Sequence, residues 1–399
     1  MKLKKEYLRY LVVCAGIIVL ASGFVFMHFG GFDTGKSLDV SEMQYYAKPI
    51  ESILIPDNAR IIALGEATHG NKEFQKLKLD VFKLLVEKYG VKGFVLEGDF
   101  GGCEEVNAYI HGGTGTAEEA VKKIGFQIYK TEEMMHLLEY MKAYNKNANE
   151  GEGLRFYGMD MQRQTYSLEA LKQECSKYGI DTTFAEEPLD AEHLLKLKGS
   201  LEMYNADSKF IQYTDVLLQN LDSMSASEAK GALKRDAYMA ENVEWVLQQE
   251  RNRGYNRIFI SGHNEHVAKW GSYVSMGKLL SEKEDYGYYV IGTDFYKTRC
   301  NLSLSKNKRT VQTFYSHDPV AKTAMLAGFS ECWLDFSTLD ETTELSQCVQ
   351  NYTYLGTLGD SYSFIQRLLP PSYRMFQPPA TLYDSMIYIS EVAPTKIRQ

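Results

Sequence analysis

Short runs of apolar residues alternate along this chain with longer segments in which apolar residues recur every three or four positions. An uninterrupted apolar run of about five residues is typical of a strand that is buried on both faces of a parallel sheet. Such runs predict strands at residues 60–64, 93–96, 155–159, 257–260 and 288–291.

The segments between these runs carry the period of an α-helix. Phe74, Leu77 and Val81 recur at helical spacing after the first run, and Gly90 is placed to end that helix. Further helical patterns cover residues 103–111, 116–125 and 132–146. Strands that alternate with helices of this length predict an α/β fold, with a mostly parallel central sheet flanked by helices.

The segment from 165 to 253 is helical in pattern almost throughout. It is longer than the single helix that usually connects two parallel strands, so we predict a helical insertion subdomain. Short β-prone segments near the C-terminus are expected to extend the sheet, and antiparallel pairing at its edge stays open. These segments cover residues 310–315, 331–336 and 385–390. The predicted domains are an anchor at 1–30, an α/β core of 31–164 and 254–399, and the insertion at 165–253.

The N-terminal segment predicts a membrane anchor. Lys2, Lys4, Lys5 and Arg9 precede an uncharged run at residues 11–29. At about 1.5 Å per residue this run spans roughly 30 Å, the thickness of a bilayer core, and it exceeds the apolar core of a cleavable signal peptide. Because basic residues stay on the cytoplasmic side, we expect a single-pass protein of the cell membrane whose body is extracytoplasmic. The alternative interpretation is a buried core helix.

Charge and cysteine content narrow the class of protein. The chain has 52 acidic and 44 basic residues and a formal net charge of −8, which argues against nucleic acid as a partner. Its six cysteines include no C-x-x-C pair, so the sequence does not resemble a small domain stapled by disulfides. The oligomeric state leaves no trace in the sequence.

Polar residues follow four of the predicted strands at the point where each strand ends. In open α/β sheets, ligands bind beyond the carboxyl ends of the strands, so these side chains are expected to meet at one edge. The set comprises Glu66, His69, Glu97, Asp160, Gln162, His263 and His266. The chain has eight histidines, and three of them lie in these turns, which points to a polar active site.

The spacing of these residues suits acid–base chemistry. Glu66 and His69 are three positions apart, and a carboxylate beside a histidine orients the ring and raises its basicity, as a general base requires. His263 can act across the cleft as an acid or as a donor to a developing oxyanion. A purely structural role is the alternative for each residue taken alone, and Asp160 can be an N-cap.

Several common catalytic motifs are absent. The chain has no G-x-S-x-G, G-x-x-x-x-G-K-[ST], G-x-G-x-x-G or H-E-x-x-H sequence.

Two histidines with one or two carboxylates match a catalytic zinc shell, so a metal-dependent hydrolase of peptide or amide bonds is one alternative hypothesis. A non-catalytic protein that binds an envelope ligand is another.

At these residues the sequence resembles the erythromycin esterase family. The signature G-E-x-T-H-G followed by E-F, the strand end L-E, the motif G-x-D-x-Q and the motif H-N-x-H occur here in that order. The first signature lies at residues 65–70 and 73–74, and the strand end lies at 96–97. The third and fourth motifs lie at 158–162 and 263–266. The resemblance implies an α/β fold with a helical subdomain and a hydrolytic water that is activated by His69, without a required metal.

The resemblance also implies supporting roles for Glu66, Glu97 and His263. Lys78 stands where family members commonly carry an arginine, and Arg and Lys differ in how they hold a carboxylate. We therefore predict a membrane-anchored, extracytoplasmic esterase-like hydrolase that cleaves a small-molecule carboxylic ester or lactone without a cofactor. The predicted catalytic residues are His69, Glu66, Glu97, His263 and His266. The predicted substrate-binding residues are Glu73, Lys78, Asp160 and Gln162.

Overall fold

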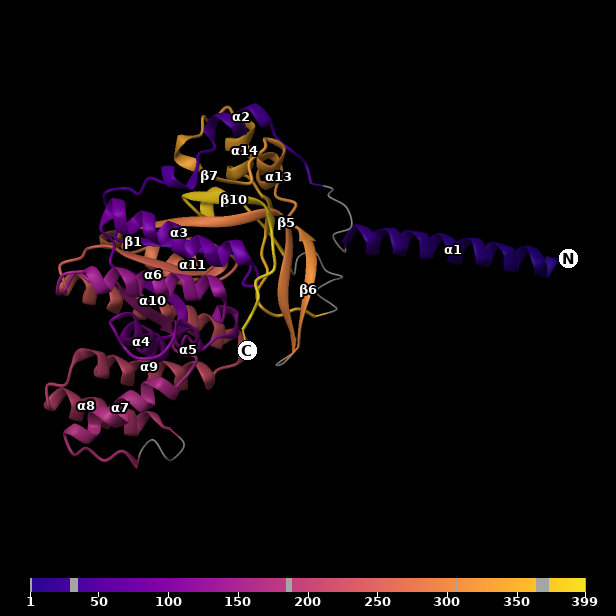
Figure 1. Cartoon of the computed structure of the whole chain (residues 1–399). Coiled ribbons are helices and arrows are strands. Elements are labelled where there is room, and N and C mark those ends of the chain that lie inside the picture. Colours follow the sequence, from indigo (N-terminus) through magenta and orange to yellow (C-terminus); the bar gives the residue numbers. More distant parts are fainter. Residues whose placement is uncertain (1, 29–34, 184–188, 306–307, 364–372, 399) are drawn as a thin grey trace.

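Figure 1 shows the computed structural model of the chain, in which helices cover both faces of a central sheet. The structure describes residues 2–28, 35–183, 189–305, 308–363 and 373–398. The predicted α/β class, with a sheet flanked by helices, is confirmed.

All the strands predicted from uninterrupted apolar runs are present. They are β1 (Ile61–Glu66), β2 (Gly93–Asp99), β3 (Arg155–Asp160), β4 (Ile258–His263) and β5 (Tyr288–Ser305). These strands are parallel and lie in the order β3-β2-β4-β1-β5, so β4 enters between β1 and β2. Alternate residues of β1 from Ile61 to Leu64 pack into hydrophobic clusters on opposite faces of the sheet, which explains why this run is apolar without interruption.

The C-terminal β-prone segments join the same sheet. β10 (Ser385–Val392) lies parallel to β5, and β7 (Glu331–Asp335) closes the edge antiparallel to β10. β6 (Lys308–Tyr315) pairs antiparallel with the long outer part of β5. β8 (Thr353–Gly356) and β9 (Arg374–Gln377) form a separate antiparallel pair that the sequence pattern did not indicate.

The first face of the sheet is covered by α3 (Lys72–Tyr89), α4 (Phe100–Ile110), α5 (Ala117–Lys123) and α6 (Glu132–Asn147). The helix α3 ends as predicted at Gly90, whose φ of 66° is a left-handed conformation that glycine adopts without strain.

Helices of the 165–253 segment divide between two hydrophobic clusters. α7 (Thr165–Lys177), α8 (Ala191–Met203) and α9 (Ser208–Met224) pack mainly with one another, and α7 and α8 lie at the lower end of Figure 1. The long helix α10 (Glu228–Asn252) buries one face against the second face of the sheet. Residues 184–188 of this predicted insertion lie outside the described residues.

Shorter helices complete the cover of the sheet. They are α2 (Val40–Tyr46), α11 (Asn264–Val267), α12 (Met276–Ser281), α13 (Pro319–Leu326), α14 (Glu344–Gln350) and α16 (Pro379–Leu382). Single 3-10 turns occur at Ile50–Ser52, Gln127–Tyr129, Glu284–Tyr286 and Phe336–Thr338.

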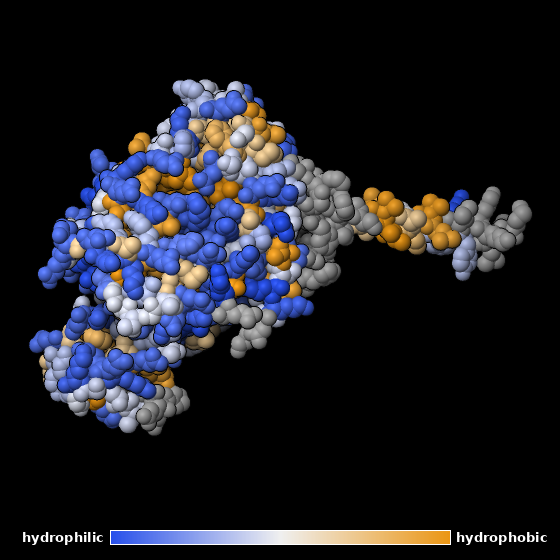
Figure 2. Space-filling model, in the orientation of Figure 1, coloured by the Kyte–Doolittle hydropathy of each residue, from blue (hydrophilic) through white to orange (hydrophobic). Residues whose placement is uncertain are grey.

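The prediction of a membrane span at residues 11–29 is not supported. A helix, α1 (Lys2–His28), does form there, and Figure 2 shows apolar side chains gathered on its described part. Among the residues that the structure describes, however, no helix is both long and apolar enough to cross a membrane. Phe29, the last residue of the predicted span, lies outside the described residues.

Candidate functional site

The strand order brings the polar turns together at one edge of the sheet. In the pairing of β1 with β4, Glu66 lies opposite His263, and β2 with Glu97 follows on the other side of β4. Gly65 makes this approach possible, because a Cβ atom there would lie 2.2 Å from the Oδ1 atom of Asn264 in the turn after β4. Residues remote in sequence thus meet as neighbouring buried side chains.

A buried ion pair and a histidine share the Glu66 carboxylate. The Nδ1 atom of His69 lies 2.7 Å from Oε1 of Glu66, and the Nζ atom of Lys78 lies 2.6 Å from Oε2. The side-chain amide of Gln75 donates to the same carboxylate at 3.3 Å. α3 supplies Lys78 and Gln75 from its buried face, one turn apart, so one helix positions both groups.

These contacts shift the pKa values of Glu66 and His69. Burial raises the pKa of the Glu66 carboxyl, but the charges of Lys78 and His69 outweigh burial and lower it to about 2. Burial lowers the pKa of His69, and the Glu66 carboxylate reverses that effect, so the pKa of His69 lies above its usual value. Glu66 is therefore ionised at neutral pH and holds the Nδ1 proton of His69.

The ring of His263 lies across from His69, with 5.0 Å between ring centroids. Its Nδ1 atom accepts the backbone N–H of Glu265 at 3.4 Å, which places the proton of the neutral ring on Nε2. That Nε2 atom is buried and has no hydrogen-bond partner among the described residues. Burial lowers the pKa of His263 to about 4, and the charge of His69 acts in the same direction. The site therefore contains a neutral, unused N–H donor.

A second buried cluster surrounds Glu97. The Oε2 atom of Glu97 accepts the backbone N–H of His263 at 2.9 Å, and Oε1 accepts from Nη2 of Arg235 at 2.7 Å. Arg235 also donates to Asp160 at 2.6 Å. His266 lies 3.5 Å from Glu97 through Nε2 and 2.9 Å from Asp236 through Nδ1.

The charges of this cluster keep Glu97 ionised. Burial raises the pKa of Glu97, but His266 and Arg235 together bring it well below its usual value. Burial lowers the pKa of His266, and Glu97 and Asp236 outweigh burial and raise it. The cluster thus fixes the backbone of His263 through a carboxylate that cannot easily be protonated.

Sequence reasoning missed several residues that complete the site. Arg235 and Asp236 come from α10, in the middle of a segment that the sequence showed only as helical. Tyr129 is fully buried, its hydroxyl has no partner among the described residues, and its ring lies 5.8 Å from the Nζ atom of Lys78. The hydroxyl of Tyr273 lies 3.3 Å from Nδ1 of His266. No motif or period in the sequence marks these four positions.

Two predicted substrate-binding residues do not reach the cluster. The carboxylate of Glu73 accepts the backbone N–H of Ala393 at 2.7 Å and so ties α3 to the C-terminal segment. The side chain of Gln162 is exposed, and its backbone N–H donates to Asp160 at 2.9 Å. Lys78 lies inside the site, where it contacts Glu66.

The donor set shows no arrangement typical of a metal site. Within the described ranges, no group of three or more His, Cys, Asp or Glu side chains is placed to hold a metal ion. The carboxylate of Glu66 faces the buried cation of Lys78, and that of Glu97 faces the partly buried cation of Arg235.

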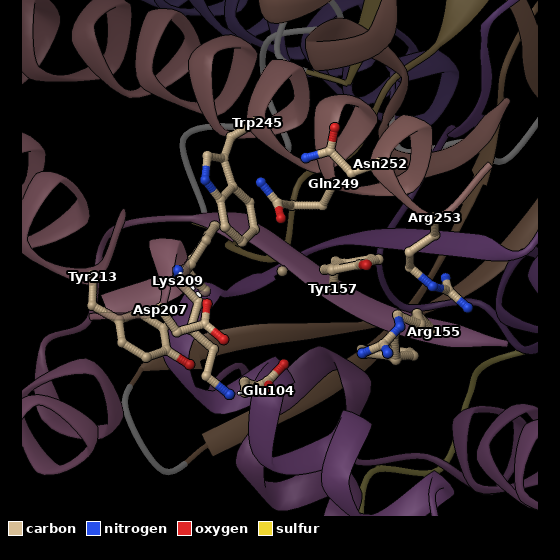
Figure 3. Close-up of a pocket in the computed structure, with 13 residues that line it drawn as sticks. Glu104, Arg155, Tyr157, Asp207, Lys209, Tyr213, Trp245, Gln249, Asn252 and Arg253 are labelled. Carbon is tan, nitrogen blue, oxygen red and sulfur yellow. Dashed lines mark hydrogen bonds and ion pairs between the residues drawn. The ribbon is translucent and has the colours of Figure 1, made fainter. Parts of the chain in front are cut away.

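A separate cavity of about 280 Å³ opens beside β3, between α9 and α10. Figure 3 shows Trp245 and Gln249 of α10 on one side of it and Tyr157 of β3 on the other. Two of the charged side chains that line it, Lys209 and Glu104, form an ion pair at 3.4 Å. None of the predicted site residues lines this cavity, so the histidine cluster is the candidate active site.

Comparisons with known proteins identify the family of the chain. A family model described as erythromycin esterase matches residues 86–187 and 185–392. The chain is 24% identical to an erythromycin esterase type II of Escherichia coli over 307 residues, which is 62% of this chain and 71% of that protein. It is 23% identical to the putative hydrolase YbfO of Bacillus subtilis over 398 residues, covering 85% of each chain.

Solved structures share the fold. A succinoglycan biosynthesis protein matches with a TM-score of 0.70 and 19% identity over 90% of this chain and 98% of that one. A mutant of the erythromycin esterase EreC in its open conformation matches with a TM-score of 0.56 and 15% identity over 84% of this chain and 91% of that one. At these identities the likeness concerns the fold alone.

Proposed function

The chain belongs to the erythromycin esterase family, and we propose that it hydrolyses carboxylic esters or lactones of small molecules. The observation that carries this proposal is the pairing of two unlike histidines. His69 is oriented by an ionised carboxylate, and 5.0 Å away the neutral ring of His263 offers a buried donor that has no partner among the described residues. A base and an oxyanion donor are the two groups that attack of water on an ester requires.

In the proposed reaction, His69 removes a proton from water through Nε2 while Glu66 holds its Nδ1–H. The water oxygen forms a bond to the carbonyl carbon, and the electron pair of the carbonyl moves onto its oxygen. The Nε2–H of His263 donates to that oxyanion. The electron pair then returns to re-form the carbonyl, the bond to the leaving oxygen breaks, and the departing alkoxide takes the proton from His69. Glu66 stabilises the imidazolium in between.

The second cluster serves to position these groups. Glu97 accepts the backbone N–H of His263, and Arg235 and His266 hold Glu97 in place. We therefore assign His266 a positioning role, in which it keeps Glu97 fixed from the side of Asp236. Lys78 keeps Glu66 ionised within the buried site.

Replacing His69 tests the proposal. His69→Ala removes the base, so kcat should fall by about 10² to 10⁴ on any ester that the wild type cleaves, while the melting temperature stays close to that of the wild type. His136→Ala is the matched control, because His136 is an exposed histidine on α6 with wild-type activity expected. Undiminished turnover by His69→Ala would refute the assignment.

Two further measurements separate the proposal from its alternatives. Elemental analysis of protein purified without added metal should show no stoichiometric zinc or manganese, and either metal at one equivalent would favour the metal-dependent hydrolase. A panel of esters and lactones should include at least one that is cleaved. A cleft that binds ligands but turns over none of the panel would favour the non-catalytic alternative.

From the sequence we also propose that the chain after residue 30 lies on the extracytoplasmic side of the cell membrane. Its N-terminal segment would hold it there. Leu11, Ile17 and Leu20 on α1 are 60–75% exposed, and residues 11–29 carry no charge. Cells expressing the full chain should retain it in the membrane fraction after washing at high pH. External protease should degrade the body in intact spheroplasts. Release by the wash, or protection from protease, would contradict this location.

A further inference from the structure

A cavity of about 490 Å³ lies next to the histidine cluster and takes no part in the reaction proposed above. It is formed by the segment that follows α11 and by the antiparallel pair β8 and β9. Aromatic rings supply much of its wall, namely Trp270, Tyr273, Tyr354 and Phe376. Its volume lies within the usual range for pockets that bind small organic molecules.

The aromatic rings of this cavity are unusually open to solvent. Trp270 and Phe376 are each 53% exposed, and Tyr354 is 46% exposed. Tyr354 and Phe376 also lie together, with 5.1 Å between ring centroids. Large apolar rings that gather at the surface of a cavity mark a place where another molecule buries them.

Two contacts connect the cavity to the candidate active site. Glu265, on its wall, donates its backbone N–H to Nδ1 of His263 at 3.4 Å. The hydroxyl of Tyr273 lies 3.3 Å from Nδ1 of His266. A molecule whose carbonyl group lies between His69 and His263 can therefore extend over these residues into the cavity.

The wall of the cavity also carries charged groups of both signs, Arg374 and Glu265. Arg374 is buried and donates Nε and Nη2 to the carbonyl oxygen of Tyr315, at 3.0 and 2.9 Å. No carboxylate among the described residues forms an ion pair with it. The cavity thus combines stacking surfaces with the guanidinium of Arg374 and the carboxylate of Glu265.

We propose that this cavity is the subsite for a ring-bearing part of the substrate, which stacks on Trp270, Tyr354 and Phe376. The inference rests on the proposed esterase function and narrows its substrate class to esters that carry an alicyclic or pyranose ring, as opposed to short acyclic esters. Both kinds of ring present a face of C–H groups, the surface that aromatic side chains bind. The cavity volume accommodates one or two such rings.

Kinetics with three acetate esters test the subsite. The esters are cyclohexyl acetate, methyl 6-O-acetyl-glucoside and ethyl acetate, which carry an apolar ring, a sugar ring and no ring. Trp270→Ala should raise KM for at least one ring-bearing ester by about tenfold with little change in kcat, so that its preference over ethyl acetate falls. Comparison of the two ring-bearing esters identifies the kind of ring. Phe376→Ala should act in the same direction.

The matched control is Tyr45→Ala, because Tyr45 is an aromatic residue on α2 that is 72% exposed and lies outside the cavity. It should keep the KM values of the wild type. If Trp270→Ala and Phe376→Ala both leave the preference for ring-bearing esters unchanged, the subsite is refuted.

Fluorescence tests the cavity independently of turnover. The chain has three tryptophans, of which Trp270 is 53% exposed and Trp333 only 3%. Titration with cyclohexanol or methyl glucoside should change the emission of the wild type, and Trp270→Phe should remove that change. A fluorescence change without hydrolysis of any ester would refute the proposed function and retain the subsite. Hydrolysis without a fluorescence change or ring preference would refute the subsite alone.

Discussion

Lys78 and Glu66 form an ion pair that is almost fully buried. Replacement of Lys78 by methionine measures how much that pair contributes to the free energy of unfolding. The side chains of Lys78 and Glu66 are 1% and 2% exposed, and 2.6 Å separates Nζ from Oε2. Methionine has a similar shape and fills the same space without charge. Among the described residues, the substitution leaves the buried Glu66 carboxylate with His69 and Gln75 as its hydrogen-bonding side chains.

The expected loss follows from the pKa of Glu66. Lys78 and His69 together outweigh burial and lower this pKa from 4.5 to about 2. At about 1.4 kcal/mol per tenfold change in the proton equilibrium, that corresponds to about 3 kcal/mol for all of these neighbours together. Removal of one partner from a buried ion pair typically destabilises a protein by roughly 3–5 kcal/mol. We therefore expect Lys78→Met to lower the free energy of unfolding by about 3 kcal/mol at pH 7.

The sign of the pH dependence gives a second check. A carboxyl whose pKa is lowered by folding stabilises the protein fully above its unfolded pKa, and this contribution disappears as the pH falls through the folded value. Without Lys78 the pKa of Glu66 is higher, so the carboxyl takes up its proton earlier. The difference between wild type and Lys78→Met should therefore shrink between pH 5 and pH 3.

Urea denaturation followed by circular dichroism, repeated at several pH values, measures this difference. Lys76→Met is the matched control, because Lys76 pairs with Asp80 on the surface of the same helix with 61% of its side chain exposed. An exposed pair contributes at most about 1 kcal/mol. Glu66→Gln added to Lys78→Met should recover part of the lost stability. A Lys78→Met protein as stable as the wild type, or one whose deficit is the same at every pH, would refute the reasoning.

Three other outcomes follow from the site. The value of kcat/KM should rise with pH, and its inflection should lie above the usual pKa of histidine because Glu66 raises the pKa of His69. Glu66→Gln should move that inflection to lower pH. His263→Phe should lower kcat by about 10² to 10³ with little change in KM, measured on the best ester; a KM effect alone would contradict an oxyanion donor. Tyr129→Phe removes a buried hydroxyl that has no partner in the described chain, so thermal melting should show no loss of stability, and a marked loss would reveal a missed hydrogen bond.

The sequence alone determined the parallel strands and the chemistry that follows them. A strand buried on both faces must be apolar throughout, so the runs that contain Ile61, Phe94 and Ile258 could be recognised without any knowledge of their neighbours. Because ligands bind beyond the carboxyl ends of such strands, the turns with Glu66, His69, Glu97 and His263 could be selected as well, and the structure places them together. The resemblance to the erythromycin esterase family, carried by the same turns, is confirmed.

Only the tertiary structure decided which charges face which. The strand β4 enters between β1 and β2, an order that local periodicity cannot report, and it sets His263 between Glu66 and Glu97. Arg235 reaches Glu97 and Asp160 because α10 packs across the sheet, while Glu73 turns away to the C-terminal segment. Such ion pairs join residues far apart in the chain, and a charged residue looks the same in the sequence whether it points to solvent or to a buried partner. Burial and pairing arise only when the layers pack, which is why the roles of these charges could not be known before.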